Sequence, residues 1–79
     1  MTEAEILTYL KTIVSEETKV PIGKIENSHT FFELGLDSIS AVYLLELVEN
    51  QYSIELKALD LWDYPSIGAF AAFVQSIKK

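Results

Sequence analysis

The strongest constraint on the fold of this chain is the repeat of apolar residues at α-helical spacing in three separate segments. Near the N-terminus the repeating residues are Ile6, Leu7, Tyr9, Leu10, Ile13 and Val14. At about 100° per residue, one side of the middle segment carries Ala41, Leu44, Leu45, Val48 and Tyr52. Leu47 lies at the edge of that side. The last stripe consists of Ile67, Phe70, Ala71, Val74 and Ile77. Each stripe has to be buried, so we predict an all-α fold, a small bundle of three main helices plus one short helix.

Residues that cap helices lie at the ends of these segments. Thr2 and Glu5 fit a capping box, and the helix that they open is expected to run to about Glu17. Ser66 follows Pro65 and can cap the last helix. At the other end of that helix, Lys78 and Lys79 complement its negative dipole end. Small side chains that would allow close helix packing there are Gly68, Ala69 and Ala72.

A long loop is expected between the first two main helices, over residues 18–36, because Pro21 and Gly23 interrupt any helix there. Three β-branched residues of this loop can turn inward: Val20, Ile22 and Ile25. Three further apolar residues should hold the loop against the core: Phe31, Phe32 and Leu34. Neighbouring aromatic residues cannot both point inward, so one of the two phenylalanines should stay partly exposed near Ser38.

The segment after the middle helix, Ser53–Lys57, alternates like a strand but has no second strand to pair with. We therefore interpret it as a connection that buries Ile54 and Leu56. Asp60 can then cap the short helix, which is expected to contain Leu61, Trp62 and Tyr64. We expect Trp62 to be a core or half-buried anchor.

The start of the middle helix carries a serine at a loop-to-helix turn. Gly35 suits a tight turn, and either Asp37 or Ser38 can cap the first free amides of the helix. The side of this helix opposite the core stripe carries Ile39, Val42, Tyr43, Glu46, Glu49 and Asn50. Apolar side chains beside a serine favour a docking surface. Two alternatives remain: Ile39 and Val42 could pack under the loop, and the glutamates could belong to a solvated face.

Composition excludes several classes of function. The 79 residues suffice for one domain, and the absence of cysteine excludes disulfides and thiolate metal sites. The formal net charge of -6, with 12 acidic and 6 basic residues and no arginine, makes nucleic acid a poor partner. An acidic surface favours partners with basic docking sites. The sequence shows neither an apolar run long enough for a membrane span nor a signal peptide, so we expect a cytoplasmic protein with no membrane partner. We also expect the chain to be a monomer.

Intrinsic catalysis is not expected. A nucleophilic serine needs a base and an oxyanion site, and the only histidine, His29, lies nine residues before Ser38 with no dedicated carboxylate. The Gly-x-Ser-x-Gly pattern is absent, because Leu36 and Ser40 occupy its glycine positions. No ligand spacing predicts a metal site. We interpret His29 as a loop residue with a satisfied hydrogen bond.

Two segments resemble a known family. The segment Phe31-Phe32-Glu33-Leu34-Gly35-Leu36-Asp37-Ser38-Ile39 resembles the attachment motif of phosphopantetheine-dependent carrier proteins. The segment Leu61-Trp62-Asp63-Tyr64-Pro65-Ser66-Ile67 is similar to the region before the last helix in carriers of the polyketide and non-ribosomal-peptide type. The resemblance spans nearly the whole chain and implies a single acyl carrier domain over residues 1–79. It also implies a non-catalytic role.

The resemblance implies that a phosphopantetheinyl transferase moves 4'-phosphopantetheine from coenzyme A onto Ser38, and that Asp37 helps to engage the transferase. A phosphodiester at a helix N-terminus meets free amides and the positive end of the helix dipole. The arm supplies the thiol that the chain lacks, so acyl groups can be held as thioesters and delivered to acyl-loading, condensing and processing enzymes of a synthase. Their docking residues would be Ile39, Val42, Tyr43, Glu46 and Glu49.

The subtype is indicated by the helix after the serine. Val42 and Tyr43 make its outer face less acidic than in carriers of dissociated fatty acid synthesis, which favours a polyketide or mixed polyketide–peptide pathway. Peptidyl, aminoacyl or fatty acyl cargo is the alternative, and an unmodified helical adaptor is an alternative of another class. The chain could be a free-standing carrier or one domain of a larger synthase.

Overall fold

The computed structural model of the protein describes residues 2–77, which form four α-helices and one short 3-10 helix. In chain order these are α1 (Glu3–Thr18), η1 (Ile22–Lys24), α2 (Ser38–Tyr52), α3 (Ala58–Asp63) and α4 (Ile67–Ile77). Within residues 2–77 there is no strand, and the segment before α3 is a plain connection. The prediction of three main helices, one short helix and a long first loop is confirmed. Lys78 and Lys79 lie outside the described residues.

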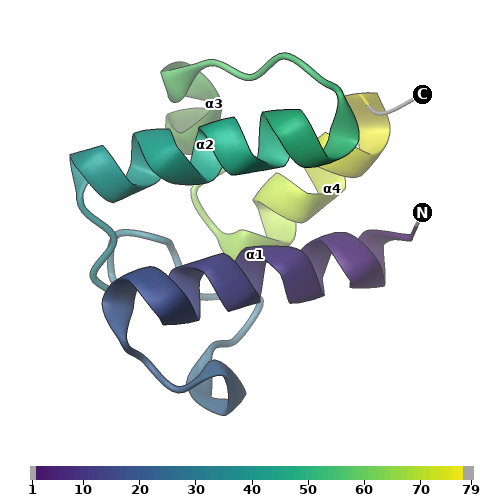
Figure 1. Ribbon diagram of the computed structural model, residues 1–79. Helices are drawn as coiled ribbons and strands as arrows, with labels where there is room; N and C mark the ends of the chain where they lie inside the picture. Colours follow the sequence, from purple (N-terminus) through teal and green to yellow (C-terminus); the bar gives the residue numbers. More distant parts are fainter. Residues whose placement is uncertain (1, 78–79) are drawn as a thin grey trace.

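The helices pack around one core. α1 packs against α4 and α2, and α3 packs against α2 (Figure 1). The predicted stripe of α2 is confirmed, because all five of its core residues are buried. In α1 the buried residues are Ile6, Leu10, Ile13 and Val14, and in α4 they are Ile67, Phe70, Ala71 and Val74. The first residues of α2 lie at the opposite end of the molecule from the start of α1 and the end of α4 (Figure 1).

The caps of α1 and α4 follow the predictions. Thr2 and Glu5 form the capping box: the Glu5 amide donates to Thr2 Oγ1 at 3.2 Å, and the Thr2 amide donates to Glu5 Oε1 at 2.9 Å. At α4, the Ala69 amide donates to Ser66 Oγ at 3.1 Å. These bonds satisfy backbone donors that have no partner inside a helix.

The loop between α1 and α2 differs from the prediction at η1. Pro21 and Gly23 do not prevent a helical turn, because the φ of -57° at Pro21 suits its start and the Lys24 amide donates to the Pro21 carbonyl at 2.9 Å. Ile22 lies in this turn and is exposed, so the prediction that it points inward is wrong. Ile25 is buried and Val20 is half-buried, as predicted.

The second half of the loop is tied to the start of α4. The Phe31 amide donates to the Pro65 carbonyl at 3.2 Å, and the Gly68 amide donates to the Asn27 carbonyl at 2.8 Å. A Cβ on Gly68 would lie 3.2 Å from the Asn27 oxygen, which is closer than an ordinary contact. We predicted that the small size of Gly68 lets a neighbouring helix approach. In the structure it lets the loop at Asn27 approach instead. Phe31 is fully buried edge-on against Phe70, with ring centroids 5.6 Å apart.

The short helix α3 begins earlier than predicted. It starts at Ala58, and Asp60 occupies its third position, from which the carboxylate accepts the Lys57 amide at 2.8 Å. Tyr64 lies just beyond the helix. Trp62 is 67% exposed, so the prediction of a core or half-buried anchor is wrong. Leu61 occupies the buried side of this short helix, so the next residue, Trp62, faces outward.

Candidate functional site

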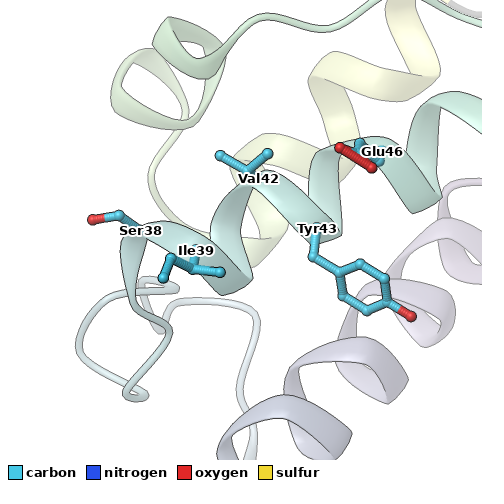
Figure 2. A pocket seen from close by; sticks show the side chains of 5 residues that line it. All are labelled: Ser38, Ile39, Val42, Tyr43 and Glu46. Carbon is cyan, nitrogen blue, oxygen red and sulfur yellow. The ribbon is translucent and has the colours of Figure 1, made fainter.

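The start of α2 presents a free serine hydroxyl. Gly35, at φ +107°, makes the turn before it, and the amides of Gly35 and Leu36 donate to carbonyls of the preceding loop. Asp37 is the cap, since its Oδ1 accepts the Ser40 amide at 2.8 Å. Ser38 is therefore the first helical residue and has no capping duty. It is exposed, and Figure 2 shows its hydroxyl pointing away from the helix.

A second hydrogen bond links this site to α1. Ser40 Oγ donates to Glu17 Oε1 at 3.1 Å, so the end of α1 holds the first turn of α2. The helix gives its N-terminus a partial positive charge, and the Asp37 cap occupies the third amide of the helix, that of Ser40. The amides of Ser38 and Ile39 stay available to a phosphate on the Ser38 oxygen. An exposed hydroxyl with open amides beside it fits a covalently attached phosphodiester.

The outer face of α2 continues from Ser38. Ile39 is 83% exposed, and Val42 and Tyr43 are each about half exposed at 51% and 48%. With Ser38 and Glu46 these residues line a shallow hollow of about 480 Å³, which Figure 2 shows from close by. The structure thus excludes the alternative in which Ile39 and Val42 pack under the loop. We call these four residues after Ser38 the outer face: Ile39, Val42, Tyr43 and Glu46.

Glu49 was predicted to share this face, and the structure gives its carboxylate another contact. Glu49 is half-buried, and its Oε2 accepts the Leu56 amide at 2.8 Å, while its carbonyl accepts the Ile54 amide at 3.2 Å. Glu49 therefore holds the connection between α2 and α3. Asn50 is exposed.

A cavity that the sequence did not predict lies between α2 and α3. It has a volume of about 150 Å³, and Ser38 forms part of its wall. Phe32, Trp62 and apolar residues of both helices complete the lining of this α2–α3 cavity: Ala41, Val42, Leu45, Ala58 and Leu61. The rings of Phe32 and Trp62 are stacked, with centroids 5.2 Å apart and planes at 22°. Of the two neighbouring phenylalanines, Phe32 is thus the partly exposed one, as predicted. The sequence signal for the cavity is the presence of Phe32 and Trp62, one in each of the two segments that carry the family resemblance.

His29 lies in the loop with a satisfied side-chain hydrogen bond, as predicted. Its Nδ1 accepts the Glu26 amide at 2.9 Å, and its carbonyl accepts the Ile67 amide at 3.0 Å. Within residues 2–77, no group of His, Asp and Glu side chains is arranged to hold a metal ion. None of the described helices is both long and apolar enough to span a bilayer.

The chain matches a family model and several known proteins. The model, described as the phosphopantetheine attachment site, matches residues 8–74. One component of the phenolphthiocerol/phthiocerol polyketide synthase of Mycobacterium tuberculosis is 30% identical over 71 residues, which are 90% of this chain and 4% of that protein. Polyketide synthase PksL of Bacillus subtilis is 31% identical over 72 residues, or 91% of this chain and 2% of that protein. The chain thus spans only a small part of these relatives.

Solved structures of similar size share the fold. A free-standing peptidyl carrier protein from Acinetobacter baumannii is 34% identical with a TM-score of 0.86, covering 94% of this chain and 92% of that one. The HMG-ACPI domain of the CurA module from Lyngbya majuscula is 30% identical with a TM-score of 0.86, covering 98% of this chain and 78% of that one. Together with the family model over residues 8–74, these likenesses show that the chain belongs to the phosphopantetheine attachment-site family of carrier domains, which bear a covalent 4'-phosphopantetheine group.

Proposed function

We propose that Ser38 is the attachment point and that the chain is an acyl carrier in polyketide-type assembly. The observation that carries this proposal is the exposed Ser38 hydroxyl at the start of α2, left free because Asp37 caps the helix. In a reaction catalysed by a separate transferase, the hydroxyl oxygen attacks the pantetheine-bearing phosphorus of coenzyme A. The pyrophosphate P–O bond breaks, adenosine 3',5'-bisphosphate leaves, and the hydroxyl gives up its proton. The attached 4'-phosphopantetheine group supplies a thiol, which the cysteine-free chain lacks, and thereby holds acyl groups as thioesters.

The residues around Ser38 have distinct roles in this proposal. The amides of Ser38 and Ile39 and the positive end of α2 stabilise the phosphodiester. The exposed Asp37 carboxylate engages the transferase. The contact between Ser40 and Glu17 keeps the first turn of α2 in place while the transferase docks. The chain itself performs no catalysis and serves as a tethered substrate, acting as a monomer in the cytoplasm.

The outer face is the proposed docking surface for acyl-loading, condensing and processing enzymes. Three exposed apolar side chains beside the attachment point can desolvate against a partner, and Glu46 adds a charge at their edge. The formal net charge of -6 steers basic partner surfaces towards the domain. Glu49 contributes less, because its carboxylate already binds the Leu56 amide.

The polyketide pathway is supported by the two relatives described above, which are polyketide synthases from Mycobacterium tuberculosis and Bacillus subtilis. Peptidyl or aminoacyl cargo is the second candidate, since the chain is 34% identical to a peptidyl carrier protein over nearly all of its length. Loading assays with acyl and aminoacyl donors distinguish these cargoes. Transfer of aminoacyl groups alone would contradict the polyketide assignment.

Intact-mass measurement tests the attachment itself. The protein is incubated with coenzyme A, magnesium and a broad-specificity transferase, and we expect the mass of one phosphopantetheine to be added. Ser38→Ala should abolish the increase, whereas Ser28→Ala, the same change at an exposed serine of the loop before α2, should keep it. If a control carrier is modified and this chain is not, the adaptor alternative is favoured.

A further inference from the structure

Glu33 lies in a segment that carries the family resemblance, yet the proposed function gives it no role. Its Oε1 accepts the Thr30 amide at 2.7 Å, and its own amide donates to Thr30 Oγ1 at 3.1 Å. These two reciprocal bonds form a capping box, the arrangement that Thr2 and Glu5 make at the start of α1. The Leu34 amide also donates to the Thr30 carbonyl at 3.3 Å, so the chain makes one helical turn after the box.

This turn covers residues 31–35 and is closed at its other end by Gly35. The Gly35 amide donates to the Phe32 carbonyl at 3.1 Å, and the Leu36 amide donates to the Phe31 carbonyl at 3.1 Å. Gly35 has a φ of +107°. These two bonds around a residue with positive φ are the Schellman motif, which ends helices. The loop before α2 therefore contains a single helical turn that is capped at both ends.

The end of this turn determines where Ser38 lies. Only Leu36 and Asp37 separate Gly35 from Ser38, and Leu36 is 2% exposed, so it anchors this short connection in the core. Asp37 is in turn bound to the Ser40 amide. With the connection anchored in this way, the direction from which the chain enters α2 depends on whether the preceding turn is formed.

The turn depends on its cap. A single helical turn is unstable by itself, because the backbone of three residues is fixed for one hydrogen bond. Glu33 is exposed and Thr30 is half-buried, so their side chains support the turn by hydrogen bonding and not by filling the core. The bond to Glu33 has a charged acceptor and is therefore stronger than a bond between neutral groups.

On the basis of the proposed attachment at Ser38, we propose that Glu33 is a positioning residue for that reaction. By capping the turn, Glu33 keeps the Ser38 hydroxyl in the orientation that the transferase engages. It acts through Thr30 and the turn, and not by offering its charge to the transferase. Loss of such a cap changes a conformational equilibrium about five-fold, so fewer chains are ready to dock.

Transferase kinetics at saturating coenzyme A test this inference. In Glu33→Ala the KM for the carrier should rise about five-fold, with kcat within about two-fold of the parent. Glu33→Gln keeps an oxygen that can accept the Thr30 amide and should restore the KM. Glu26→Ala removes the same charge from the same loop and is the matched control, because Glu26 bonds to His29 only through its backbone amide. Its KM should equal that of the parent.

A second variant covers the case in which Glu33→Ala does not fold. Thr30→Val removes the hydroxyl that accepts the Glu33 amide, and it should also raise the KM without lowering kcat. Circular dichroism and the melting temperature verify that each variant is folded at the assay temperature.

The outcomes separate this inference from the proposed function. Absence of any mass increase in the parent contradicts the proposed function and this inference with it. If the parent is modified, an unchanged KM in folded Glu33→Ala overturns the inference alone and leaves the attachment at Ser38 standing. A KM in Glu33→Gln as high as in Glu33→Ala overturns it too, because the charge of Glu33, and not its hydrogen bond, would then act on the transferase.

Discussion

The proposed attachment site depends on a division of roles between adjacent residues. Asp37 accepts the Ser40 amide and takes the capping duty, so the hydroxyl of Ser38 remains free. The sequence allowed either residue to be the cap, because both side chains can accept such a bond and the choice depends on the backbone angles of the turn after Gly35. A residue-scale feature of the structure therefore decides which side chain is available for chemistry.

Ser53 ends α2 in the left-handed conformation, with φ 55°. This conformation is costly for residues with a Cβ and free of that cost for glycine. We expect Ser53→Gly to raise the free energy of unfolding by about 0.5 kcal/mol, because relief of the strain exceeds the added chain entropy of the unfolded state. Chemical denaturation measures the change. Ser28→Gly, at an exposed loop position without positive φ, is the control and should not stabilise.

The capping box of α1 predicts a pH dependence. The hydrogen bond from the Thr2 amide, and then that from the Thr2 hydroxyl, hold the pKa of the Glu5 carboxyl below its ordinary value of 4.5. Since the folded-state pKa is lowered, the stabilisation is present above pH 4.5 and is lost as the pH falls through the folded-state pKa. The difference in stability between the parent and Glu5→Ala should therefore shrink on acidification. Glu16→Ala, elsewhere on α1, is the control; an equal pH dependence there would contradict the prediction.

At the scale of elements, α2 combines a core face and an exposed apolar face. The predicted core stripe of α2 is confirmed because helical periodicity and apolar character point to the same side. The contact of Glu49 could not be predicted in this way. It depends on how the connection to α3 turns back, which brings the Leu56 amide, seven residues later, within 2.8 Å of the carboxylate.

The proposed docking role of α2 predicts the effect of Tyr43→Glu. Tyr43 is 48% exposed and belongs to the outer face, so the change should leave the helical circular dichroism and the melting temperature nearly unaltered. A buried charge at an interface costs on the order of 1–2 kcal/mol, so the KM of a partner enzyme for the loaded carrier should rise about 10-fold. Gln51→Glu, at an exposed position of α2 away from the outer face, is the matched control. Unchanged turnover with every partner would remove Tyr43 from the docking surface.

At the scale of the whole molecule, the loop before Ser38 is held by the far end of the chain. Phe31 packs against Phe70 and its amide donates to the Pro65 carbonyl, so the proposed attachment site is built from segments that are distant in sequence. The helices could be predicted from local periodicity and caps. The exposure of Ile22 and Trp62 could not be predicted, because it depends on which side of a short helical turn the rest of the fold covers. The α2–α3 cavity was missed for the same reason.

Localisation of the modification by fragment mass spectrometry tests the central claim most directly. The chain, treated with coenzyme A and a transferase, is digested, and the modified peptide is sequenced. The structure predicts one phosphopantetheine, on Ser38, since this hydroxyl is exposed and free at the start of α2. Modification of another residue, or its persistence in Ser38→Ala, would contradict the account.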